Sequence, residues 1–64
     1  MEYDFGVMMS TVEEGKVLAL EIGIKNNGKP IYRVSVFNGK TWSGACYHSF
    51  KSAHTTYKLL ERVM

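Results

Sequence analysis

The residues best suited to acid–base, nucleophilic or metal chemistry are few: one aspartate, Asp4, and a Cys46-x-His48 pair followed by His54. A nucleophile needs a neighbouring base that a third group orients, and neither histidine has a serine or aspartate at a recognisable spacing. The cysteine and the two histidines offer three potential zinc ligands. Structural zinc takes four ligands with tighter spacing signatures. We therefore expect no enzymatic activity, no bound metal and no cofactor.

Charge is distributed unevenly along the chain. Residues 25–64 carry seven basic side chains and one glutamate, a net charge of +6, whereas residues 1–24 have a net charge of −4. This asymmetry points to a polyanionic partner for the second part of the chain. Basic groups contact phosphates and planar groups stack on bases, and this part interleaves the two kinds. The residues predicted to bind nucleic acid are Lys25, Lys29, Arg33, Ser35, Lys40, Trp42 and His48.

Apolar side chains accompany these basic groups, which favours a protein interface as an alternative or an addition. A chain of 64 residues buries only a thin core, and its single cysteine excludes an internal disulfide. Self-association is then the remaining way to stabilise the domain, so we expect a homodimer. An exposed apolar patch suits such an interface. The residues predicted to form it are Val17, Ile31, Phe37 and Trp42.

Two alternating runs separated by Asn38-Gly39 predict a β-hairpin that positions most of these residues. Asn-Gly favours a two-residue type I′ turn, which needs positive φ at both positions. That turn places Ser35 opposite Trp42 and Val34 opposite Ser43. One face then carries Tyr32, Val34, Val36, Thr41, Ser43, Ala45 and Tyr47, and the other carries Ile31, Arg33, Ser35, Phe37, Lys40, Trp42, Cys46 and His48.

The preceding strand, residues 16–25, has the clearest period of two, with Leu18, Leu20, Ile22 and Ile24 on one side. A three-residue turn with Gly28 in the left-handed region makes one face of the paired strands continuously apolar. It sets Leu20 opposite Val34. The same register places Glu21 opposite Arg33, an opposite-charge pair that was not used to choose it.

The ends of the chain complete the predicted architecture. Residues 3–12 predict a first strand, and a two-residue turn at Glu14-Gly15 places Phe5, Val7 and Met9 on the apolar face. A three-residue turn would place Gly6, Met8 and Ser10 there instead. After the last strand, a helix over 52–63 is predicted, capped by Ser52, with its apolar side formed by Ala53, Thr56, Tyr57, Leu60 and Val63 or Met64.

These elements predict a single α+β domain over 1–64, a four-stranded antiparallel β-sheet followed by one C-terminal helix. The strands are expected at about 3–12, 16–25, 30–37 and 40–48. In this two-layer ββββα arrangement the helix covers the face that carries Leu18, Leu20, Ile22, Tyr32, Val34 and Val36.

From Lys29 onward, residues 29–63 resemble the AP2/integrase-type DNA-binding domain found in phage and transposon integrases and in plant transcription factors. The similarity rests on Tyr32-Arg33-Val34-Ser35-Val36, on Asn38-Gly39-Lys40 and on Ser49-Phe50-Lys51-Ser52 before a helix. The resemblance implies a three-stranded sheet in the DNA major groove. Arg33, Ser35, Lys40 and Trp42 would face the groove, and Phe50 would seal the helix against the sheet. The family's small alanine one turn into the helix is Thr56 here. The ββββα order is also similar to the dimeric single-strand-binding coactivator class.

The leading functional prediction is a nucleic-acid-binding accessory or regulatory protein of phage or mobile-element type, with DNA as the preferred partner. The alternative is a protein-binding module, such as a phage-type inhibitor of a host nucleic-acid-processing enzyme. A third is a structural subunit that only oligomerises. The sequence shows no leader segment and no apolar run that could cross a membrane, and its lone cysteine fits a reducing compartment, so we expect a cytoplasmic protein.

Overall fold

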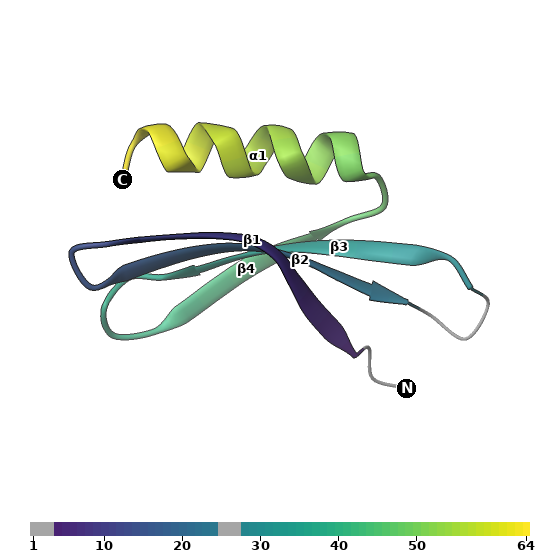
Figure 1. Cartoon of the computed structure of the whole chain (residues 1–64), viewed down its shortest axis with the longest axis horizontal. Coiled ribbons are helices and arrows are strands. Elements are labelled where there is room, and N and C mark those ends of the chain that lie inside the picture. The colour runs from purple at the N-terminus through teal and green to yellow at the C-terminus, as the bar shows by residue number, and fades with distance from the viewer. Residues whose placement is uncertain (1–3, 25–27) are drawn as a thin grey trace.

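The computed structural model, which describes residues 4–24 and 28–64, contains one antiparallel sheet in the order β1-β2-β3-β4 and one helix after it. The elements are β1 (Phe5–Glu13), β2 (Lys16–Ile24), β3 (Pro30–Phe37), β4 (Trp42–Tyr47) and α1 (Phe50–Arg62). Figure 1 shows α1 lying across one side of the sheet while the other side is uncovered. The predicted ββββα fold is therefore confirmed.

The core lies between α1 and the two central strands. Its fully buried side chains are Leu18 and Leu20 of β2, Val34 of β3, and Ala53 and Tyr57 of α1. Partly buried side chains pack around them: Met9, Tyr32, Val36, Tyr47, Leu60 and Met64. The alternation of β2 and β3 thus delivers one apolar row to the helix, as the sequence predicts. Val63 and Met64 were the two alternatives for the last residue on the apolar side of the helix. Met64 packs on the core, whereas Val63 is 79% exposed.

The register between β2 and β3 is the predicted one. Leu20 pairs with Val34, Glu21 pairs with Arg33, and Gly28 has a φ of 81°. The left-handed region costs glycine no steric strain, which suits this residue to the turn.

The register between β1 and β2 differs from the prediction beyond Met9. The two-residue turn at Glu14-Gly15 is present, and both residues have positive φ. A β-bulge then inserts Met8 between Val7 and Met9, so Val7 pairs with Glu21 instead of Ile22. An inserted residue moves every residue before it to the other face. Met9 accordingly packs on the core as predicted, whereas the placement of Phe5 and Val7 on that face was wrong.

The hairpin of β3 and β4 closes through four residues, not two. Phe37 pairs with Trp42, which leaves residues 38–41 as the loop. The side-chain oxygen of Asn38 accepts hydrogen bonds from the backbone N–H groups of Lys40 (2.9 Å) and Thr41 (3.0 Å). This side-chain cap competes with the type I′ turn, and only Gly39 takes a positive φ. The predicted pairing was therefore wrong by two residues, an even shift that leaves each side chain on its predicted face.

The helix begins two residues earlier than predicted, because Ser49 caps it instead of Ser52. The Ser49 hydroxyl accepts a hydrogen bond from the Ser52 N–H at 3.2 Å. At the other end, Tyr57 and Glu61 hold β1 through Thr11, whose hydroxyl lies 2.6 Å from the Tyr57 hydroxyl and donates to Glu61 Oε2 at 2.8 Å. Within residues 4–24 and 28–64, no helix is long and apolar enough to span a membrane.

Candidate binding surface

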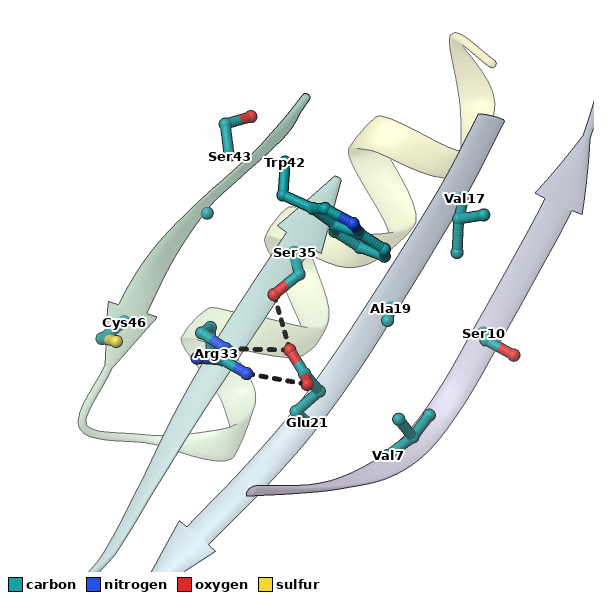
Figure 2. A pocket seen from close by; sticks show the side chains of 11 residues that line it. Val7, Ser10, Val17, Ala19, Glu21, Arg33, Ser35, Trp42, Ser43 and Cys46 are labelled. Carbon is teal, nitrogen blue, oxygen red and sulfur yellow. Dashed lines mark hydrogen bonds and ion pairs between the residues drawn. The ribbon is translucent and has the colours of Figure 1, made fainter. Parts of the chain in front are cut away.

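The side of the sheet opposite α1, here named the outer face, holds the residues that the sequence analysis assigned to binding. All four strands contribute to it in alternation. Its members are Phe5, Val7, Ser10 and Val12 of β1, Val17, Ala19 and Glu21 of β2, Ile31, Arg33, Ser35 and Phe37 of β3, and Trp42, Gly44 and Cys46 of β4. Figure 2 views this face with α1 behind the sheet.

The outer face is hollowed at its centre. An open depression of about 600 Å³ is lined from all four strands, with Val7 and Ser10 on one side and Gly44 and Cys46 on the other. A concave apolar surface of this kind can receive a protruding side chain of a partner.

A hydrogen-bonded polar cluster lies at the centre of the depression. Arg33 donates from Nε to Glu21 Oε1 and from Nη2 to Oε2, both at 2.9 Å, in a bidentate pair (Figure 2). The Ser35 hydroxyl donates to the same Oε1 at 2.5 Å. Two adjacent strands place these groups because Glu21 and Arg33 are direct cross-strand partners.

Burial and pairing shape the electrostatics of this cluster. The Glu21 side chain is 12% exposed and the Arg33 side chain 38%. The hydrogen bond from Arg33 lowers the pKa of Glu21, and this outweighs the partial burial that would raise it. The bond to Glu21 likewise raises the pKa of Arg33. Both groups therefore stay ionised and neutralise each other across the physiological range.

Arg33 is engaged on a second side as well. Its guanidinium carbon lies 3.9 Å from the centroid of the Phe5 ring. A cation at this distance over a ring face is attracted by the ring quadrupole. Arg33, which the sequence analysis predicted to contact phosphate, is thus held by the carboxylate of Glu21 and the ring of Phe5.

Aromatic surface is concentrated at the β3–β4 end of the outer face. The rings of Phe37 and Trp42 lie 5.2 Å apart, and Trp42 remains 59% exposed. Figure 2 shows the indole of Trp42 directed over the sheet from β4. An exposed indole that a neighbouring ring supports is a suitable anchor for a partner.

The structure brings together only some of the predicted binding residues. Arg33, Ser35, Phe37, Trp42 and Val17 share the outer face, with Ile31 at its β3 end. Ser35 is buried in the polar cluster and not available to a ligand. The remaining predicted residues lie elsewhere: Lys40 is exposed in the hairpin loop, Lys29 is exposed before β3, His48 is exposed before α1, and Lys25 lies outside the described residues.

Several members of the outer face were missed by the sequence analysis. Val7 and Phe5 reach it only because of the bulge at Met8, for which the sequence carries no signal. Gly44 lies on it because it pairs with Ser35, and the structure explains why a glycine occupies this position. A Cβ at this position would lie 2.9 Å from the carbonyl oxygen of Val34, so no larger residue fits without a shift. An isolated glycine within a strand is the signal that could have indicated such a close approach.

Two further observations complete the description of the site. Phe50, the first residue of α1, contacts the ring of Tyr32 edge-on at 5.8 Å, although it remains 41% exposed. Across residues 4–24 and 28–64, the side chains of His, Cys, Asp and Glu form no group of three or more that could hold a metal ion. Cys46 and His48 therefore gain no third ligand within this part of the chain.

No protein-family model, curated protein or solved structure matches the chain.

Proposed function

We propose that this protein is a protein-binding module whose outer face receives an apolar side chain of a partner. The observation that carries the proposal is the composition of the depression, in which exposed apolar groups surround one ion pair that is already neutralised. Arg33 is the basic residue that the four strands contribute to this face, and Glu21 holds it in a bidentate pair. A surface of this kind gains affinity from apolar burial and not from phosphate contacts.

Trp42 is the expected centre of binding energy. Tryptophan, tyrosine and arginine dominate the binding energy of protein interfaces when they lie in well-packed pockets. Trp42 is 59% exposed and supported by Phe37, so a partner can bury a large part of its indole without reorganising the sheet. Val7, which is 63% exposed, extends the apolar surface across the depression to β1.

The charge around this anchor indicates the chemistry of the partner. Lys40 is exposed two residues before Trp42, and the chain carries a net charge of +2. A lysine beside an apolar anchor favours a partner whose own anchor has a carboxylate next to it. The proposed partner is therefore a protein segment with an apolar or aromatic side chain among acidic residues.

A displayed peptide library selected against the intact chain tests this proposal. We expect selected peptides to combine an aromatic or aliphatic residue with acidic neighbours. Trp42→Ala should weaken their binding about 30-fold, the equivalent of about 2 kcal/mol for an interface hot spot. Leu59→Ala is the matched control, because Leu59 is 55% exposed but lies on α1. Peptides that bind Trp42→Ala and the wild type equally would refute the assigned face.

Nucleic-acid binding is the second candidate, and the exposure of Trp42 near Lys40 favours it. Base stacking on an exposed indole next to a cation is a common way to hold a single strand. A titration with mixed-sequence duplex and single-stranded DNA at two salt concentrations, followed by Trp42 fluorescence, separates the candidates. Phosphate contacts make affinity fall steeply with salt, so salt-dependent quenching that Lys40→Ala reduces would favour nucleic acid. The protein-binding proposal expects no such quenching.

A further inference from the structure

The edge strand β4 lacks the features that ordinarily keep an edge strand from pairing with another chain. Its six residues, all described by the structure, include no charged side chain and no proline, and its pairing with β3 is regular. An edge strand presents unpaired N–H and C=O groups, and natural proteins protect such edges with charges, proline or bulges. The opposite edge, β1, has this protection, since it carries the bulge at Met8 and ends at Glu13.

The backbone of β4 is also accessible from both sides of the sheet. On the α1 side, Ser43 and Ala45 are exposed, so the helix does not cover the edge there. On the outer face, Gly44 and Cys46 are exposed, and Gly44 has no side chain. A second strand could therefore approach β4 without displacing any element of the domain.

We propose that β4 pairs antiparallel with β4 of a second copy, which joins two four-stranded sheets into one about a two-fold axis at Gly44. Antiparallel pairing of a strand with its own copy is self-complementary. If one residue of the first copy contacts a second residue of the partner, that second residue of the first copy contacts the first residue of the partner. This symmetry keeps both helices on one side and both outer faces on the other. The inference does not depend on the proposed function.

The register follows from side-chain size on the outer face. With the axis at Gly44, the bulky Trp42 lies opposite the partner's Cys46, and the two Gly44 residues meet at the axis. Large and small side chains then complement each other across the new strand pair. The depression is lined by Trp42, Gly44 and Cys46 on its β4 side, so the partner's β4 would border it there.

Sedimentation equilibrium of the full chain, from micromolar to near-millimolar concentration, tests the pairing. We expect the wild type to be a dimer and Ser43→Lys to be a monomer, because a lysine on an edge strand blocks edge-to-edge pairing. Val12→Lys is the matched control, since Val12 is 68% exposed on β1 at the opposite edge, and it should remain dimeric. Circular dichroism of both variants checks that they fold.

Two results would overturn the pairing: a monomeric wild type throughout this range, or a Ser43→Lys variant that dimerises as tightly as the wild type. Dissociation by Val12→Lys alone would place the interface on β1 or the outer face and would equally refute β4. Peptide binding is a separate readout. A monomeric wild type that still binds the selected peptides through Trp42 would refute the pairing and leave the proposed function in place.

A cross-linking experiment tests the register. Positions 42 and 46 of one copy lie four residues apart on one strand, roughly 13 Å, which is too far for a disulfide within the chain. In the proposed dimer they face each other across the axis, so Trp42→Cys should form a covalent dimer under mild oxidation through the native Cys46. Ser43→Lys added to this variant should abolish the cross-link. Equal cross-linking of the wild type through Cys46 alone would contradict the register.

Discussion

The ion pair between Glu21 and Arg33 allows the most direct test of the energetics of the outer face. The two side chains share two hydrogen bonds of 2.9 Å, and the carboxylate is only 12% exposed. Bonds to charged groups are worth about 1.5–3 kcal/mol each in buried settings. Because Arg33 is 38% exposed, water screens the pair, and we expect a coupling energy on the order of 1–2 kcal/mol.

A double-mutant cycle with Glu21→Gln, Arg33→Met and the combined variant measures this coupling. Arg33→Met should be the more damaging single change, because it leaves a largely buried carboxylate with only the Ser35 hydroxyl as a side-chain donor. Urea unfolding followed by far-ultraviolet circular dichroism gives the free energies. For a domain of this size each kcal/mol also lowers Tm by roughly 4–8 °C.

The pH dependence gives an independent check with a defined sign. The pKa of Glu21 is lowered in the folded state, chiefly by the bond from Arg33. Its contribution to stability is therefore complete above the ordinary carboxyl pKa and is lost as the pH falls through that value towards the lowered one. In Arg33→Met the main cause of the lowering is absent, so the loss of stability in acid should be shallower than in the wild type.

The exposed pair of Lys58 and Glu61 on α1 serves as the control cycle. Its atoms are 3.3 Å apart, and its side chains are 55% and 35% exposed. Surface pairs of this kind couple only weakly, because water screens both charges. A coupling between Glu21 and Arg33 no larger than that of the control, or within the roughly 0.3 kcal/mol error of additivity, would refute the reasoning.

Three other substitutions should have measurable effects on urea unfolding. Gly44→Ala should destabilise by about 1–3 kcal/mol because its Cβ would meet backbone 2.9 Å away. Its control, Gly6→Ala, places a Cβ that meets nothing within 4 Å and should be close to neutral. Tyr57→Phe should cost about 1 kcal/mol, since it deletes the hydroxyl that lies 2.6 Å from Thr11; no loss would mean that the bond adds nothing to stability. Asn38→Ala removes the acceptor of two backbone N–H groups and should cost on the order of 1–2 kcal/mol, unless the loop closes without this cap.

Periodicity predicted the parts of the fold in which side-chain burial alone decides the outcome. Leu18 and Leu20 pair with Val36 and Val34, because a register shifted by one residue would place apolar groups in water and charge in the core. The pairing of Glu21 with Arg33 follows from the same register. The candidate face could therefore be located from the sequence, and most residues of β2, β3 and β4 were assigned to it correctly.

The chemical character of that face was less accessible to sequence reasoning. Arg33 and Ser35 were interpreted as ligands for nucleic acid, whereas the structure engages both with Glu21. The sequence indicates that two opposite charges are neighbours, but not that they form a bidentate pair in which the carboxylate neutralises the arginine. The bonding of a polar group depends on distances and angles that only the folded backbone sets.

Taken by itself, the sequence determined the order of elements, the side of the sheet that the helix covers and the register of the central strands. The alternating pattern has one apolar row to bury, and the turn at Gly28 aligns that row across β2 and β3. The tertiary structure decided the bulge at Met8, the four-residue loop that Asn38 closes and the capping of the helix by Ser49. Each of these depends on which of two local hydrogen-bonding arrangements has the lower free energy in its surroundings. That difference is small, and contacts with the rest of the domain settle it.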